Sequence, residues 1–242
     1  MSTMKYVIII PARYNSKRLP GKPLMMIKKV PMIVRTYIQC TKACPSNQIF
    51  VATDDKRIIN ICNKYEINTI LTSKKCLTGT DRVAEASKKI VADYYINVQG
   101  DEPVINAKDI KKLINSLSKY PDEVLNGYTK IIYDLQHTDK NVPKVALDLN
   151  NMLLYMSRAP IPIDKSGKMK SAHRQVCIYS YPKKLLNKFY VHGKKTPLEK
   201  IEDIEILRFL ELGMSVRMIP MSNKSIPVDN YRDLKKVSKA LS

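Results

Sequence analysis

Short apolar runs alternate with amphipathic stretches along the first half of the chain. Residues 7–10 form an unbroken β-branched run, which is typical of a strand buried on both faces. The same pattern predicts strands over 48–53, 67–71 and 94–98, and helices over 31–43, 54–65, 79–91 and 107–117. Strands that alternate with helices at this interval predict an α/β fold with a mostly parallel sheet, right-handed crossovers and helices on both faces.

The pattern changes to shorter extended runs after about residue 125. These runs cover 126–133, 144–149, 152–157 and 174–181, and Asn150-Asn151 suits a tight hairpin turn. An amphipathic helix over 198–212, a strand over 216–220 and a helix over 229–241 follow. We therefore predict one domain over 1–242. Its core is formed by 1–124 and 196–242. Residues of about 125–195 form a smaller antiparallel lobe, which we expect to carry the acceptor side of a substrate-binding site.

A strongly basic loop follows the first predicted strand. Arg13, Lys17, Arg18 and Lys22 lie within ten residues, and Pro20, Gly21 and Pro23 constrain the backbone between them. Open α/β sheets bind ligands at the carboxyl ends of their strands. Guanidinium groups give bidentate contacts to phosphate, so this loop predicts a binding site for a polyanion such as a nucleoside triphosphate.

The overall charge allows several kinds of partner. The 42 Lys and Arg residues against 22 Asp and Glu leave a formal net charge of +20, which could serve nucleic acid, an anionic membrane or small anionic substrates. The lysines are scattered as pairs, which favours solvated helix faces and no nucleic-acid partner. A nonenzymatic RNA-binding protein remains the alternative, although three Phe and no Trp leave no recognisable stacking platform.

The cysteines and the apolar runs indicate the compartment. The five cysteines are odd in number and form no CxxC pair, so we expect reduced thiols in packing positions. No signal-peptide pattern and no apolar run of membrane-spanning length is apparent. We expect a cytoplasmic protein without membrane insertion.

Two carboxylates follow apolar runs at predicted strand or turn ends. Asp101 lies in NVQGDEP, where Gly100 allows a sharp turn, and Asp229 lies in IPVDNYRD. Together they could hold one Mg²⁺ that also binds phosphate oxygens. For Asp229 the alternative is a helix N-cap.

Other polar positions also have two interpretations. Thr78, Gly79 and Arg82 in TGTDR form either a helix cap or a ligand-binding turn. Arg158 serves either a surface ion pair or a carboxylate clamp. The evenly spaced glutamates, Glu199, Glu202 and Glu205, indicate a solvated helix face, unless the helix borders the site and they accept hydrogen bonds from sugar hydroxyls.

Taken together, these motifs resemble those of a known family. PARYNSKRLPGKPL, VATDD, TGTDR, INVQGDEP, LYMSR, PLEKIEDIEILR and the VD of IPVDNYRD occur in the order found in the CMP-ulosonate synthetases, most closely the 3-deoxy-manno-octulosonate cytidylyltransferases. The resemblance covers nearly the whole chain. It implies a Rossmann-like domain with a dimerising lobe, a homodimer, Mg²⁺ as cofactor, and CTP and an acidic eight-carbon sugar as partners. The implied reaction transfers CMP from CTP to the anomeric hydroxyl of a 3-deoxy-2-ulosonic acid, for surface polysaccharide or lipopolysaccharide synthesis.

The resemblance also implies roles for individual residues. Arg13, Arg18 and Lys22 would hold the triphosphate. The backbone near Ala12 and the turn containing Thr78, Gly79 and Arg82 would seat the cytidine. Asp101 and Asp229 would bind magnesium. Arg13, Lys22 and these two carboxylates would form the catalytic set. The positions that match the sugar acid site are Gln99, Arg158, Tyr179 and Glu205, with Arg158 opposite the sugar carboxylate.

This chain departs from the family pattern on the sugar side. The family segment HxGIYGY reads QVCIYSY here, so Gln175 replaces a histidine, and Cys177 and Ser180 replace glycines. The sugar-facing Glu-Gln pair becomes Glu205-Ile206. A pocket that loses a polar partner discriminates differently among hydroxylated substrates. The predicted acceptor is therefore 3-deoxy-D-manno-octulosonate, or else a modified or different acidic sugar such as an 8-amino ulosonate or a nonulosonic acid. A sugar phosphate used with another nucleoside triphosphate is a further alternative.

Overall fold

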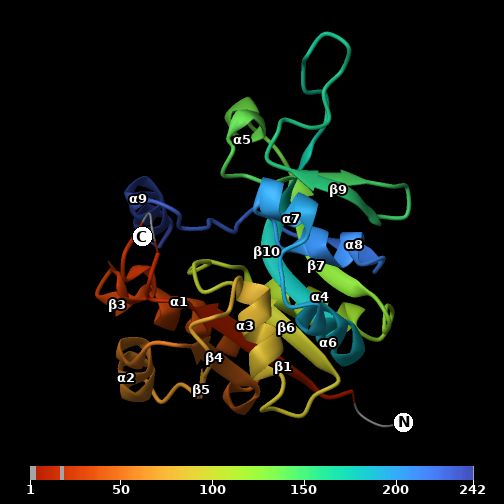
Figure 1. Cartoon of the computed structure of the whole chain (residues 1–242). Helices are drawn as coiled ribbons and strands as arrows, with labels where there is room; N and C mark the ends of the chain where they lie inside the picture. Colours follow the sequence, from red (N-terminus) through yellow and green to blue (C-terminus); the bar gives the residue numbers. More distant parts are fainter. Residues whose placement is uncertain (1–3, 17–18, 242) are drawn as a thin grey trace.

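The computed structural model describes residues 4–16 and 19–241, in which a nine-stranded sheet forms the centre (Figure 1). Its main path has the order β11-β7-β10-β6-β1-β4-β5. β10 runs antiparallel to its neighbours β6 and β7, whereas the β1–β4, β1–β6, β4–β5 and β7–β11 pairs are parallel. The predicted mostly parallel sheet is confirmed. The strands of this path are β1 (Tyr6–Ala12), β4 (Ile49–Thr53), β5 (Thr69–Leu71), β6 (Tyr94–Val98), β7 (Val124–Lys130), β10 (His173–Pro182) and β11 (Val216–Pro220).

Helices cover both faces of this sheet. Side chains alternate along a strand, so Ile8 and Ile10 pack on one face and Val7 and Ile9 on the other. The first face is covered by α1 (Met32–Thr41), α2 (Lys56–Lys64) and α4 (Ala107–Ser116). The second is covered by α3 (Gly79–Ala86), α6 (Lys183–His192) and α8 (Ile206–Glu211). The predicted two-sided α/β arrangement is therefore confirmed.

The long strand β10 joins the main sheet to a projecting hairpin. Its first residues pair with β8 (Lys144–Leu147), which pairs with β9 (Leu153–Ser157). The predicted turn at Asn150-Asn151 is present, and the Asp148 carboxylate accepts hydrogen bonds from the backbone N–H groups of Asn150 and Met152. In Figure 1, β9 and α5 (Asp134–Thr138) lie beyond the end of the main sheet. β7 and β10 belong to the main sheet although they fall within 125–195, and the dimerising function of that segment stays a prediction.

Two helical predictions differ from the structure, and one helix was not predicted. The helix predicted over 198–212 is wrong: α7 (Pro197–Glu202) and α8 are separated at Asp203, whose φ of 50° is left-handed and ends the first helix. The helix predicted over 79–91 ends at Ala86. α6 was not predicted; Pro182 precedes it and Gly193, with φ of 70°, ends it.

A small subassembly brings the end of the chain to the basic loop. α9 (Tyr231–Ala240) lies beside the short strands β2 (Met26–Ile27) and β3 (Val30–Pro31), as Figure 1 shows. Leu19, Val228 and Val237 are among the buried side chains of this contact. The segment before α9 therefore lies beside the loop after β1. Two 3₁₀ helices complete the described elements, η1 (Lys22–Leu24) and η2 (Ser46–Gln48).

Candidate active site

Lys22 lies between the two carboxylates that were singled out in the sequence. Its Nζ is 2.6 Å from Asp101 Oδ2 and 3.7 Å from Asp229 Oδ1, and it donates a hydrogen bond to the carbonyl oxygen of Val228 at 3.0 Å. Gly21 precedes η1 with φ of 69°, a left-handed conformation that glycine adopts without strain. The structure thus brings Lys22, Asp101 and Asp229 to one cation position near the carboxyl end of β1.

The N-cap interpretation of Asp229 is wrong. The N-cap of α9 is Asn230, whose side chain accepts hydrogen bonds from the N–H groups of Arg232 and Asp233. Since the neighbouring residue caps the helix, the carboxylate of Asp229 is directed to Lys22 instead.

Gly100 lets the loop that carries Asp101 lie against the end of β1. A Cβ at this position would be 2.8 Å from the carbonyl oxygen of Pro11 and 3.1 Å from Ile33 Cδ1. The Gly100 carbonyl accepts a hydrogen bond from Thr36 Oγ1 at 3.2 Å. This close approach fixes the backbone position from which the Asp101 side chain extends.

The paired carboxylates fit the donor set of a magnesium site. Carboxylate oxygens are preferred Mg²⁺ ligands, and Mg²⁺ usually takes one or two of them together with water and phosphate oxygens. Over residues 4–16 and 19–241 no group of three or more His, Cys, Asp or Glu side chains could hold a metal ion. The pair therefore suits an ion that is also bound by phosphate oxygens of a ligand. It does not suit an ion that is bound by protein side chains alone.

The rest of the basic loop is described in part. Ala12 is buried at the end of β1, and Arg13 is exposed directly after it. A hydrogen bond from Lys195 is the main cause that lowers the pKa of Asp203, and the Arg13 charge contributes to the same shift. Arg13 thus acts electrostatically on the corner between α7 and α8, whereas Arg18 lies outside the described residues.

The TGTDR turn makes protein contacts through most of its polar groups. Thr78 caps α3, since its Oγ1 accepts from the N–H of Asp81 at 3.1 Å. The Thr80 N–H donates to Glu205 Oε2 at 2.6 Å, and Gln99 Nε2 donates to Glu205 Oε1 at 3.3 Å. A Cβ on Gly79 would be 2.7 Å from Gln99 Nε2, so the close approach that this glycine permits is with Gln99. The cap interpretation is confirmed, and the role of the turn in seating cytidine stays a prediction.

Arg82 is buried and ties α3 to the neighbouring strand ends. Its guanidinium donates to Thr72 Oγ1, just after β5, and lies 3.4 Å from the carboxylate of Asp54, just after β4. The charge of Arg82 is thus compensated within the protein.

The solvated-face interpretation of Glu199, Glu202 and Glu205 is wrong. Glu199 is buried and binds Arg208, which is 0% exposed and also binds Asp81 at 2.7 Å. Glu202 accepts from the backbone N–H of Arg158 at 2.8 Å, and Glu205 accepts from Thr80 as described. Sequence reasoning missed Arg208; its place within the otherwise apolar ILRFL run was the available signal.

Arg158 stabilises the corner between α7 and α8. Its guanidinium donates to the carbonyl oxygens of Glu202, Asp203 and Lys140, which are 2.5, 2.9 and 2.8 Å away. This differs from the predicted surface ion pair. Its role opposite a sugar carboxylate stays a prediction.

Gln175 and Tyr179 lie in β10 and are both buried. Gln175 Nε2 donates to Asn126 Oδ1 at 3.0 Å, and Asn126 in turn donates to the carbonyls of Val176 and Ile178 beside a bulge in β10. Burial raises the pKa of Tyr179 and of Glu205, although hydrogen bonds from Thr80 partly offset the shift of Glu205. Glu205 contacts the Gln99 side chain directly, and the binding roles of Gln175, Tyr179 and Glu205 stay predictions.

Comparison with known proteins identifies the family of the chain. A profile of the cytidylyltransferase family matches residues 7–218. The chain belongs to this family. It is 34% identical to the 3-deoxy-manno-octulosonate cytidylyltransferase of Thermodesulfovibrio yellowstonii, with 99% of each chain covered. It is 33% identical to the enzyme of the same name from Escherichia coli, with 96% of this chain and 94% of the relative covered.

The solved structures of other cytidylyltransferases match the fold. A CMP:2-keto-3-deoxy-manno-octonic acid synthetase complexed with CTP superimposes with a TM-score of 0.89 and 33% identity, and 98% of each chain is covered. A cytidylyltransferase from Leptospira borgpetersenii matches with a TM-score of 0.66 and 16% identity, which supports the fold alone.

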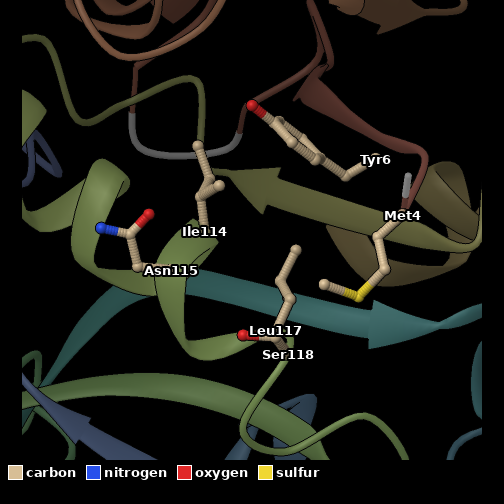
Figure 2. A pocket seen from close by; sticks show the side chains of 6 residues that line it. All are labelled: Met4, Tyr6, Ile114, Asn115, Leu117 and Ser118. Atoms are coloured by element: carbon tan, nitrogen blue, oxygen red, sulfur yellow. The ribbon is translucent and has the colours of Figure 1, made fainter. Parts of the chain in front are cut away.

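One surface hollow of this cytidylyltransferase family member lies away from Lys22. This hollow, of about 400 Å³, is shown in Figure 2. It lies between the start of β1 and the end of α4 and is lined by Met4, Tyr6, Ile114, Asn115, Leu117 and Ser118. The hollow lies at the amino ends of the parallel strands, whereas Asp101 lies at their carboxyl ends. None of the predicted site residues lines it. Among the described residues, no helix is long and apolar enough to cross a membrane.

Proposed function

We propose that this chain is a magnesium-dependent 3-deoxy-manno-octulosonate cytidylyltransferase, which transfers CMP from CTP to the anomeric hydroxyl of 3-deoxy-D-manno-octulosonate. The observation that carries the proposal is the contact of one ammonium, that of Lys22, with both Asp101 and Asp229 near the carboxyl ends of β1 and β6. Full-length relatives that carry this name support the acceptor, and the related structure with CTP supports the donor.

The reaction breaks one phosphoanhydride bond and forms one phosphodiester bond. The anomeric oxygen attacks the α-phosphorus of CTP in line, the bond from that phosphorus to the bridging oxygen of the β-phosphate breaks, and pyrophosphate leaves. The hydroxyl proton passes to solvent or a nearby base. Little covalent chemistry is required of the protein, so positioning and electrostatic stabilisation supply the rate enhancement.

The basic loop would stabilise the leaving group. Arg13, Arg18 and Lys22 supply positive charge for a pyrophosphate that gains charge as the bond breaks. Asp101 and Asp229 would hold Mg²⁺, which when bound supplies charge neutralisation at the phosphates and lowers the pKa of an attacking hydroxyl. Lys22 is held at this position by Asp101 and by the Val228 carbonyl.

The acceptor would bind beside the end of β6. Gln99 follows β6, and its amide is held by Glu205, which also fixes the start of α3. Glu205, Tyr179 and Arg158 would bind the sugar hydroxyls and carboxylate, and Gln175 would influence selectivity from β10. Ile206 is buried in the core, so the position where related enzymes carry a polar residue offers no hydrogen bond here. The proposal includes a cytoplasmic homodimer that supplies CMP-sugar for surface polysaccharide or lipopolysaccharide synthesis.

A substrate screen tests this proposal. The purified chain is given each of the four nucleoside triphosphates with Mg²⁺ and one acceptor at a time, and both pyrophosphate and the nucleotide sugar are measured. The acceptors are 3-deoxy-manno-octulosonate, its 8-amino derivative, a nonulosonic acid and a hexose 1-phosphate. We expect CTP with 3-deoxy-manno-octulosonate to give equal amounts of both products. A preference for the 8-amino or nine-carbon acid would change the acceptor, and no reaction with any ulosonate would overturn the function.

A further inference from the structure

Asp101 and Asp229 lie on two segments that have no helix or strand of their own. Asp101 lies in the loop between β6 and α4, and Asp229 in the segment 221–230 between β11 and α9. The N–H of Val228 donates to the carbonyl oxygen of Asp101 at 3.0 Å. This backbone hydrogen bond joins the two segments directly, and side-chain contacts add to it.

A buried polar cluster joins these segments behind the carboxylates. Glu102, Arg174 and Ser225 are 1%, 6% and 3% exposed. Ser225 Oγ donates to the Glu102 carboxylate. Arg174 Nη2 donates to Asn223 Oδ1 at 2.6 Å and to the carbonyl oxygen of Ser225 at 3.3 Å. The segment before Asp229 is therefore bound both by Glu102 and by Arg174.

Two residues of this cluster are close in sequence to the two carboxylates. Glu102 directly follows Asp101, and Ser225 lies four residues before Asp229. Arg174 comes from β10, a strand of the main sheet, and gives the cluster a rigid support. Buried polar and charged groups disfavour any arrangement in which they lose their hydrogen bonds. Movement of the segment before Asp229 away from Asp101 would break these bonds.

We propose that Arg174 and Glu102 are positioning residues that set the position of Asp229 relative to Asp101 and thereby the affinity of the pair for a divalent cation. The inference rests on the proposed magnesium site. Neither residue is required to touch the nucleotide or the sugar. Groups that orient metal-binding carboxylates in this way typically change metal affinity on the order of 10-fold or more when they are removed.

Two serines on the same segment provide a matched test. Ser225→Ala removes the hydroxyl that binds Glu102. Ser222→Ala is the control, because it also removes a hydroxyl bonded to a carboxylate, but that of Asp109 on α4, 2.6 Å away. Mn²⁺ is titrated into each folded full-length chain with saturating CTP and no acceptor, and the Mn²⁺ that the protein binds beyond CTP alone is measured by electron paramagnetic resonance. We expect Ser225→Ala to weaken Mn²⁺ binding on the order of 10-fold, and Ser222→Ala to bind within about twofold of wild type.

Arg174→Lys is the second variant. It keeps the positive charge, but a single ammonium does not reproduce the fork that reaches both Asn223 and Ser225. We expect weaker Mn²⁺ binding, with CTP affinity in the absence of metal unchanged. Wild-type Mn²⁺ affinity in both Ser225→Ala and Arg174→Lys would overturn the inference, and so would equal weakening by Ser222→Ala. A wild-type chain that binds no more Mn²⁺ than CTP alone would overturn the metal assignment, and the inference with it. The substrate screen with pyrophosphate and nucleotide-sugar readouts tests the proposed function separately.

Discussion

Gly100 lies where the loop after β6 touches β1, and a Cβ there would meet the carbonyl oxygen of Pro11 at 2.8 Å. Because the obstacle is backbone within the sheet, Gly100→Ala must displace the loop that carries Asp101. Overpacking of this kind costs about 1–3 kcal/mol. We expect a lower unfolding midpoint in denaturant and a reduced kcat of the folded fraction. An unchanged midpoint with full activity would show that the loop accommodates the methyl group.

Arg208 is the charged residue on which the packing of α8 depends most. Its guanidinium binds Glu199 and Asp81, and it is fully buried over the ring of Phe189. Arg208→Met leaves two buried carboxylates without this partner, which costs about 3–5 kcal/mol.

Arg217→Met is the matched control for that change. Arg217 also binds a carboxylate, that of Glu123, but both side chains are partly exposed, so we expect a cost of about 1 kcal/mol or less. Chemical denaturation measures both variants. Equal losses would contradict the assignment of Arg208 as a buried structural centre.

At the residue scale, the sequence identified the groups that carry chemistry better than their partners. Asp101 and Asp229 were found because each follows an apolar run, and Lys22 because it lies in the basic loop after the first predicted strand. Glu199 was misread because its spacing with Glu202 defines a helix face without saying what covers that face. The cluster of Glu102 and Arg174 was missed, because only the fold brings a loop residue next to a residue of β10.

At the scale of elements, the corner between α7 and α8 depends on Glu202. Burial acts to raise the pKa of Glu202, but hydrogen bonds from the Arg158 N–H, Ser157 and Tyr155 outweigh it and lower the pKa below its ordinary value. A carboxyl group whose pKa is lowered by folding stabilises the protein above its unfolded pKa, and this stabilisation is lost as the pH falls through the folded pKa.

Glu202→Gln therefore has a pH-dependent cost. We expect the free energy of unfolding of the variant to be lower than that of the wild type near pH 7. The difference should shrink as the pH falls below about 4.5. Denaturation curves from pH 7 to pH 3 measure it. A difference that stays constant or grows on acidification would contradict the account of this carboxylate.

Strands were predicted more accurately than helices. The predicted strands 94–98 and 216–220 have the observed bounds of β6 and β11, because buried strands read as short apolar runs with clear ends. The apolar stripe over 198–212 continues across the break at Asp203, so periodicity could not reveal two helices. α6 was missed because its first turn is the basic Lys183-Lys184 pair and its buried face is narrow.

At the scale of the whole molecule, the five thiols are packing groups. All five cysteines are free, and Cys40, Cys44 and Cys62 are buried. Burial raises the pKa of Cys44 to about 11 and that of Cys62 and Cys76 to about 12. Thiolates are the reactive form, so the native protein should react slowly with a disulfide reagent at pH 8, and all five thiols should react after denaturation. Rapid reaction of the native protein would contradict this packing.

We expect Lys22, Asp101 and Asp229 to form the centre that catalyses cytidylyl transfer. The most direct test compares the kcat of wild type, Asp101→Asn and Asp122→Asn with saturating CTP, Mg²⁺ and 3-deoxy-manno-octulosonate, with the CMP-sugar product identified by mass. Asp122 is the control because it is exposed and lies just before the amino end of β7, whereas Asp101 lies just after the carboxyl end of β6. We predict that Asp101→Asn lowers kcat by about 100-fold or more, while the folded Asp122→Asn variant keeps wild-type turnover. Near-normal turnover by a folded Asp101→Asn variant would contradict the account.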